Sequence, residues 1–162
     1  MNVTETDLLI KQARKGKVRV KIVELKMVRE SSAEYESAVY NVNDVLKMMK
    51  PFFNRNYREM AVVIGLNTAN IPCVIHTVGC GNPCSSPVYV GNVFKPLLLS
   101  NASSFILLHN HPASTLNPSQ CDKEITSRLK DAGKLLEVEM TDHVIIDADC
   151  EKCFSFRNQG LL

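Results

Sequence analysis

The order of apolar patterns along the chain predicts a mixed α/β domain in which helices flank a central sheet. Short apolar runs of strand length alternate with longer segments whose apolar residues recur at helical spacing. The 162 residues are enough for one domain with a single hydrophobic core. Hydrophobic residues make up 45% of the chain and charged residues 22%, which is the balance of an ordinary globular protein.

The first part of the chain carries the weakest signals. Residues 18–28 alternate apolar and charged side chains, as a half-buried strand does. Residues 11–19 form a basic run without the aromatic side chains that stack on nucleic-acid bases, so a solvated surface explains them. We therefore divide the chain into an N-terminal extension, residues 1–38, with one extra strand, and a folded domain, residues 39–162.

The domain is expected to begin with a helix and a β-hairpin. Asn43 can cap a helix that ends near Pro51, with apolar side chains at helical spacing between the two. Residues 59–66 and 71–78 are apolar runs separated by a turn, which predicts two paired strands. A loop rich in glycine and proline follows at residues 79–87.

Two further helices and three strands complete the expected order. Residues 89–101 are expected to be largely helical, with Pro96 as a kink or an early boundary. The apolar run 105–108 predicts a buried strand that stops at His109, because Pro112 disfavours its continuation. The remaining expected elements are a helix from about Ser119 to Leu136, a strand within residues 138–147 and a short strand at 154–157.

Side chains that bind metals gather just after the buried run 105–108. His109 and His111 are two residues apart, so in an extended chain their imidazoles point the same way. Asp122 lies in the first turn of the helix that Ser119 would cap. Two nitrogens and one carboxylate oxygen are the three protein ligands of many catalytic zinc sites, which keep a fourth position for water. Each residue alone has an ordinary structural explanation, but their combination predicts a zinc site.

The spacing in this stretch resembles a known signature. His-x-His-Pro, six residues, Ser, two residues and Asp is similar to the JAMM motif of the JAB/MPN metalloprotease superfamily. The segments HNHP, PSQCDKEIT and DHVIID resemble those of the RadC branch of that superfamily. The resemblance covers roughly Val39 to Asn158. It implies the MPN/JAB-like fold, which is cytidine-deaminase-like, with a central mixed sheet flanked by helices.

The same resemblance implies a reaction and assigns roles. It implies a zinc-dependent metallohydrolase, a peptidase or isopeptidase, with one catalytic Zn²⁺ held by His109, His111 and Asp122. The segment NYREMAVVIGLN resembles the family segment that carries an upstream glutamate, which makes Glu59 the general acid/base. Ser119 matches the serine that stabilises the oxyanion, although helix capping competes for its hydroxyl. Apart from the resemblance, Glu59 would be read as an ordinary glutamate at a strand edge.

Six cysteines allow a second hypothesis about metal binding. Their spacing includes C-x3-C and C-x2-C pairs, which could together form a structural zinc site. The resemblance implies no such site and we do not expect one. Without a secretion signal, a disulfide framework is not expected either. The four residues concerned are Cys80, Cys84, Cys150 and Cys153.

Charge and hydropathy restrict the partners. The net charge of +2 is too small to indicate nucleic acid or an anionic membrane as a partner. No apolar stretch has membrane-spanning length and no signal-peptide core is present, so the expected location is the cytoplasm. A protein or peptide substrate is the expected partner, and the oligomeric state stays open. Two alternatives to an enzyme are a non-catalytic protein-interaction module and a RadC-like factor associated with DNA repair or mobile elements.

Overall fold

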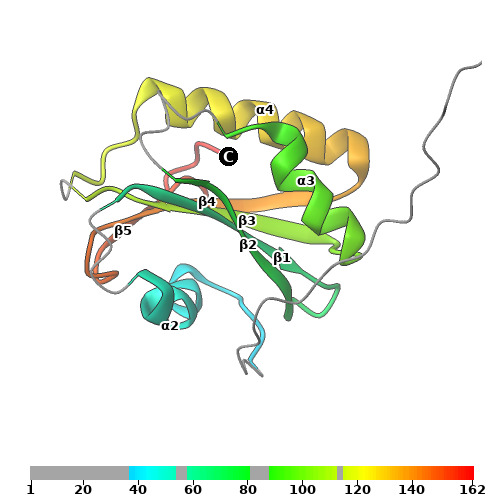
Figure 1. Ribbon diagram of the computed structural model, residues 1–162, viewed down its shortest axis with the longest axis horizontal. Helices are drawn as coiled ribbons and strands as arrows, with labels where there is room; N and C mark the ends of the chain where they lie inside the picture. The colour runs from blue at the N-terminus through cyan, green and yellow to red at the C-terminus, as the bar shows by residue number, and fades with distance from the viewer. Residues whose placement is uncertain (1–36, 54–57, 81–87, 113–114) are drawn as a thin grey trace, which may run out of the picture.

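The computed structural model describes residues 37–53, 58–80, 88–112 and 115–162, which form a five-stranded sheet with helices on both faces (Figure 1). This arrangement confirms the mixed α/β fold. The strand expected at residues 18–28 lies outside the described residues. The described elements are α2 (Val42–Phe53), β1 (Met60–Leu66), β2 (Pro72–Cys80), α3 (Val90–Leu99), β3 (Ser104–Asn110), α4 (Gln120–Leu136), β4 (Glu139–Ile146) and β5 (Cys153–Ser155).

The sheet is mixed, with strand order β2-β1-β3-β4-β5. The hairpin β1–β2 is antiparallel, as expected, and β1 also pairs antiparallel with β3. In contrast, β3 and β4 are parallel, and α4 makes the crossover that a parallel pair requires. The loop between β3 and α4 therefore lies at the carboxyl end of β3.

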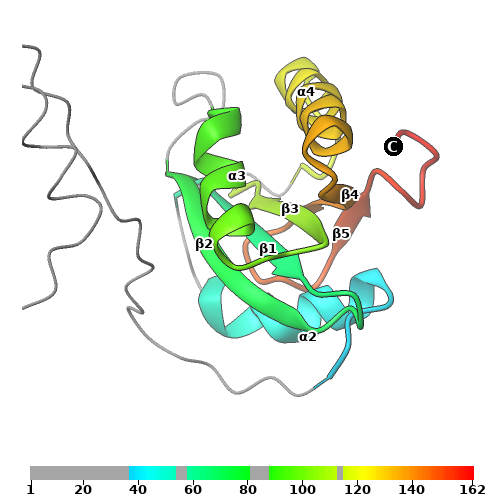
Figure 2. The ribbon, with the colours of Figure 1, turned by 90° about the vertical axis from the view of Figure 1, so that its right-hand side faces the viewer.

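Helices cover both faces of the sheet and divide the core into two layers. Figures 1 and 2 show α2 on one face and α3 and α4 on the other. All seven residues of β3 are buried because both faces of this central strand are covered. Ile106 and Leu108 pack in the layer beneath α2, whereas Phe105 and Leu107 pack in the layer beneath α3 and α4. By the same alternation, His109 faces the α4 side.

Three expected boundaries differ from the structure by one or two residues. The cap of α2 is Asn41, because its Oδ1 accepts hydrogen bonds from the backbone N–H groups of Asn43 and Asp44 at 2.9 and 3.2 Å. The helix also continues through Pro51 to Phe53. Strand β3 extends past His109 to Asn110, which pairs with β4 before the chain reaches Pro112.

None of the described helices is long and apolar enough to cross a membrane.

Helix α4 packs tightly against the start of β4 at Gly133. A Cβ atom on this glycine would lie 2.5 Å from the backbone oxygen of Val138, and the Val138 N–H donates to the Gly133 carbonyl at 2.9 Å. Only glycine allows this close approach of α4 to the start of β4. Gly133 therefore helps to set how α4, which carries Asp122, packs on the sheet.

We expect Gly133→Ala to lower the free energy of unfolding by about 1–3 kcal/mol, because the added methyl group must displace backbone. Gly91→Ala, in α3, is the matched control, since a Cβ there meets nothing within 4 Å. Alanine favours helix, so this control should be as stable as the wild type or more stable by up to about 1 kcal/mol. Urea denaturation measures both, and a fully stable Gly133→Ala protein would contradict the packing described.

Candidate metal centre

Three elements meet at the carboxyl end of β3 and bring the predicted side chains together. His109 is next to the last residue of β3 and pairs with Ala61 of β1. Glu59, just before β1, lies beside His111, just after β3, with its Oε1 4.0 Å from His111 Nε2. Asp122 comes from the first turn of α4. The sheet register and the start of one helix therefore build the site from segments far apart in the sequence.

The acceptor atoms of these four side chains converge. The two imidazole Nε2 atoms of His109 and His111 are 2.9 Å apart. Asp122 Oδ1 lies 3.3 Å from His109 Nε2, and Asp122 Oδ2 lies 3.8 Å from His111 Nε2. Glu59 Oε1 lies 4.0 Å from His111 Nε2. Ligand atoms of Glu59, His109 and His111 all lie within 4.8 Å of one another, so this group could hold a metal ion.

Nδ1 of His111 carries a proton. This atom is 2.6 Å from the carbonyl oxygen of Thr115, which can only accept a hydrogen bond. Nε2 is therefore the nitrogen of His111 that faces the site, 2.9 Å from Nε2 of His109.

A longer chain of hydrogen bonds fixes the proton of His109. The Thr126 hydroxyl donates to the carbonyl oxygen of Asp122 at 2.5 Å, so it can only accept from His143 Nδ1, which is 2.6 Å away. His143 Nε2 then has a lone pair and accepts from His109 Nδ1 at 2.9 Å. His109 is therefore protonated on Nδ1, and its Nε2 lone pair also faces the site.

Asp122 is held by its own helix cap. The Ser119 side chain accepts from the Asp122 N–H at 3.2 Å, while Asp122 Oδ2 accepts from the N–H and the hydroxyl of Ser119, each at 2.7 Å. This reciprocal capping box directs the other carboxylate oxygen, Oδ1, at His109. The Ser119 hydroxyl hydrogen is thus donated to Asp122, and the serine positions the carboxylate.

Asn110, between the two histidines, positions the glutamate. Its Oδ1 accepts from the backbone N–H of Met60 at 2.7 Å, and its Nδ2 donates to the carbonyl oxygen of Arg58 at 3.0 Å. Both neighbours of Glu59 are therefore tied to the same buried side chain. This role could not be predicted from the sequence, because the bonds join residues about fifty positions apart.

Burial sets the protonation of the site. It lowers the pKa of His109 to about 4, against the opposing effect of Asp122, and it also lowers the pKa of His143 well below its usual value. Both rings are therefore neutral near pH 7. Burial also raises the pKa of Glu59, while the nearby His111 lowers it. The Glu59 carboxyl thus takes up a proton more readily than an exposed glutamate does.

The residues fit a divalent metal. Bonds of about 2.0–2.1 Å to nitrogen or oxygen place two tetrahedral ligands about 3.3 Å apart. The separations of 2.9 Å between the two Nε2 atoms and 3.3 Å between His109 Nε2 and Asp122 Oδ1 lie around that value. A cation would take the place of the hydrogen that the two nitrogens share at 2.9 Å. The arrangement can therefore hold a cation.

All five residues predicted for the site lie in this cluster, namely Glu59, His109, His111, Ser119 and Asp122. The division into metal ligands and catalytic residues stays a prediction. Sequence reasoning missed His143 as the partner of His109, and Thr126 as the partner of His143. The only signal was the histidine within the segment DHVIID, to which the sequence assigned no role.

The cysteines form no second centre of the kind considered above. Cys80 is in β2 and Cys153 in β5, which are opposite edges of the sheet and about 19 Å apart at the usual strand spacing. They cannot share one ion, and Cys84 lies outside the described residues. Cys121 is disulfide-bonded, so a disulfide forms at this residue although no disulfide framework was expected. The cellular compartment sets only a tendency, whereas a disulfide needs two thiols brought close by the fold.

Comparison with known proteins identifies relatives of this chain. The family model described as RadC-like JAB domain matches residues 39–161. A UPF0758 protein of Chlorobaculum tepidum is 37% identical over 124 residues, which are 76% of this chain and 55% of the relative. A UPF0758 protein of Rubrobacter xylanophilus is 40% identical over 105 residues, 65% of this chain and 45% of the relative. The chain thus spans about half the length of these two relatives, whose names state no activity.

We expect Asn110→Ala to expose the backbone around Glu59. The Met60 amide would lose its buried acceptor, and its hydrogen exchange should accelerate by roughly 10- to 100-fold. The amide of Val63, in the middle of β1, is the internal control and should keep its protection. Hydrogen exchange followed by NMR measures both amides in one sample. Unchanged protection of Met60 would mean that Asn110 does not hold this segment.

Proposed function

This chain belongs to the family of RadC-like JAB domains, and on that premise we propose that it is a zinc-dependent hydrolase that cleaves peptide or isopeptide bonds. The observation that carries the proposal is the convergence of ligand atoms from His109, His111 and Asp122. Their own hydrogen bonds orient these side chains toward the same point. Two ring nitrogens and a carboxylate oxygen gathered there suit a cation better than a neutral group.

We assign His109, His111 and Asp122 as the metal ligands. When bound there, zinc would supply Lewis-acid activation of water and of an amide carbonyl. Two neutral imidazoles and one carboxylate are a common ligand set for catalytic zinc, which supports this ion over a hard cation that prefers oxygen ligands.

Glu59 is proposed as the general acid/base. Its carboxylate lies beyond His111, at 4.0 Å, where it can take a proton from an attacking water and pass it to the leaving amine. The raised pKa that burial gives it favours this exchange. A direct role as a ligand is the competing assignment, because Glu59, His109 and His111 form the group whose ligand atoms all lie within 4.8 Å of one another.

The exposure of the side chains favours a substrate site over a closed structural site. The side chains of His109 and Asp122 are 4% and 2% exposed, whereas those of His111 and Glu59 are 15% and 18% exposed. Access is therefore from the Glu59 side, where a peptide carbonyl would meet the proposed base. Catalytic zinc sites keep such an open position and structural sites do not.

Ser119 has a narrower role in this proposal than the family resemblance implies. Its hydroxyl hydrogen is donated to Asp122 Oδ2 at 2.7 Å, so it holds the carboxylate. Oxyanion stabilisation would require the hydroxyl to turn away from Asp122 as charge develops on the substrate.

The test combines metal content and hydrolysis. We expect one zinc per chain in the wild type and none in His109→Ala/His111→Ala. Glu59→Gln should keep its zinc and lose hydrolysis of peptide and isopeptide substrates by about 10²- to 10⁴-fold. Glu124→Gln is the matched control, because Glu124 is an exposed acid of α4 whose carboxylate accepts a hydrogen bond from Gln120 Nε2 at 3.1 Å. It should keep both zinc and activity.

Other outcomes separate the alternatives. A wild-type protein that takes up no zinc on titration would contradict the hydrolase and leave a protein-interaction module as the better explanation. Zinc lost in Glu59→Gln would make this residue a ligand. Zinc bound without hydrolysis of any peptide or isopeptide probe would contradict the proposed reaction but not the metal site.

A further inference from the structure

We propose that His143 and Thr126 are positioning residues that determine which nitrogen of His109 carries its proton, and thereby make His109 Nε2 a metal ligand. The inference rests on the metal site of the proposed function and extends it beyond the ligands. His143 reaches the site through His109, and Thr126 reaches it through His143 and through the backbone carbonyl of Asp122.

One hydrogen bond connects the rings of His109 and His143, and either ring could be its donor. The bond between His109 Nδ1 and His143 Nε2 needs one donor and one acceptor. In one direction both rings carry their proton on Nδ1, and the Nε2 lone pair of His109 faces the site. In the other direction both rings carry it on Nε2, and His109 presents an N–H where a ligand is needed. The protons of the two rings therefore shift together.

The Thr126 hydroxyl selects the first direction. Its single hydrogen is donated to the Asp122 carbonyl, which leaves only lone pairs to meet His143 Nδ1 at 2.6 Å. Because that nitrogen must then donate, His143 Nε2 must accept. The chain of bonds starts at the backbone of Asp122 and ends at His109 Nε2, which lies 3.3 Å from the carboxylate of the same Asp122. Asp122 and His109 are therefore connected twice, once through Thr126 and His143 and once by their direct contact.

Packing holds the His143 ring in the plane that these bonds need. His143 is fully buried, and the ring of Phe156 stacks on it with centroids 4.7 Å apart and planes 13° apart. The backbone N–H of Phe156 also donates to the His143 carbonyl at 2.9 Å. A ring held in this way cannot turn to find another acceptor, so the hydroxyl of Thr126 is the group that decides its tautomer.

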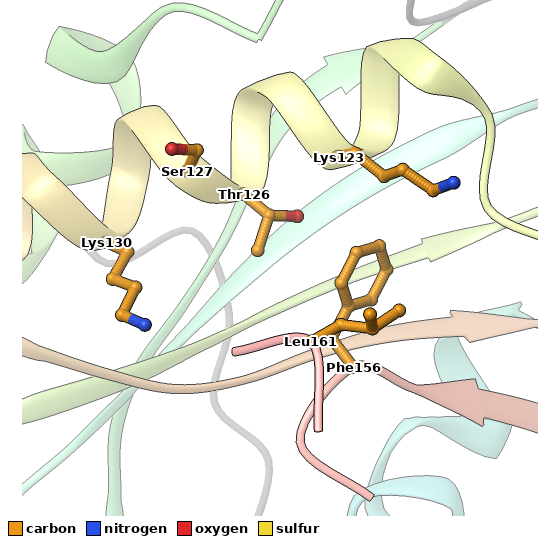
Figure 3. Close-up of a pocket in the computed structure, with 6 residues that line it drawn as sticks. All are labelled: Lys123, Thr126, Ser127, Lys130, Phe156 and Leu161. Atoms are coloured by element: carbon orange, nitrogen blue, oxygen red, sulfur yellow. The ribbon is translucent and has the colours of Figure 1, made fainter. Parts of the chain in front are cut away.

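The Thr126 end of this chain of hydrogen bonds lies beside a surface pocket. Thr126 and Phe156, which both contact His143, line a pocket of about 270 Å³ between α4 and the C-terminal segment (Figure 3). Water from this pocket could replace a hydroxyl if the side chain were shortened. The test therefore needs a substitution that removes the hydroxyl but keeps the branched shape, which is Thr126→Val. Thr126→Ser is the matched control, since it keeps the hydroxyl and loses the methyl group.

Two measurements, one with metal and one without, test whether Thr126 and His143 set the tautomer of His109. Long-range ¹H–¹⁵N NMR of the metal-free protein reads the tautomer of each ring. We expect Nδ1–H on His109 and His143 in the wild type and in Thr126→Ser, and a shift toward Nε2–H on both rings in Thr126→Val. Competition with a chromophoric chelator measures zinc affinity, which should fall roughly 10- to 100-fold in Thr126→Val and stay near the wild type in Thr126→Ser.

A double-mutant cycle asks whether Thr126 acts through His143. His143→Phe removes the acceptor for His109 but keeps an aromatic ring against Phe156. In that background Thr126→Val should cause no further loss of zinc affinity. A further loss of zinc affinity of the same size would overturn the proposal that Thr126 acts through His143.

The remaining outcomes are equally decisive. Wild-type tautomers in Thr126→Val would overturn the proposal, and so would an affinity loss in Thr126→Ser equal to that in Thr126→Val. If the wild type bound no zinc, the proposed function would fail, while the tautomers of the metal-free protein would still show whether Thr126 sets them.

Discussion

The constraint on which the site depends is the hydrogen bond that the Thr126 hydroxyl donates to a backbone carbonyl, because this bond orders the protons of His143 and His109. From that bond the directions of the contacts through His143 to His109 follow without further choice. The carbonyl belongs to Asp122, whose carboxylate faces the same histidine. The Nε2 atoms of His109 and His111 are held 2.9 Å apart, which is a geometry that a cation can bridge.

The fold supplies this geometry through one parallel strand pair and its crossover helix. Because β3 and β4 are parallel and joined by α4, the end of β3 lies beside both the start of the helix and the strand that follows it. His143 pairs opposite Leu107, two residues before His109 on the same face. Gly133 lets α4 approach β4 closely enough for its inner side to reach these rings. The buried polar cluster is tolerated because none of its described atoms lacks a partner.

Much of the fold and the core of the site could be predicted because their signals are local. Apolar runs mark the strands, and the spacing of His109, His111 and Asp122 follows from one strand end, one loop and one helix start. The parts that could not be predicted depend on pairing between distant segments. Asn110 reaches Met60 fifty residues away, and Thr126 reaches His143 across the sheet–helix interface. The capping residue of α2 was misplaced because Asn41 and Asn43 both suit a cap and only the backbone geometry distinguishes them.

The most direct test of the account is anomalous diffraction at the zinc absorption edge from crystals of the full chain grown with zinc. We predict one strong peak within bonding distance of Nε2 of both His109 and His111 and of a carboxylate oxygen of Asp122, with the His143 and Thr126 contacts unchanged. No peak at this position, or a peak bound through the Nδ1 atoms, would contradict the view that the hydrogen bonds behind the cluster direct its lone pairs at a metal.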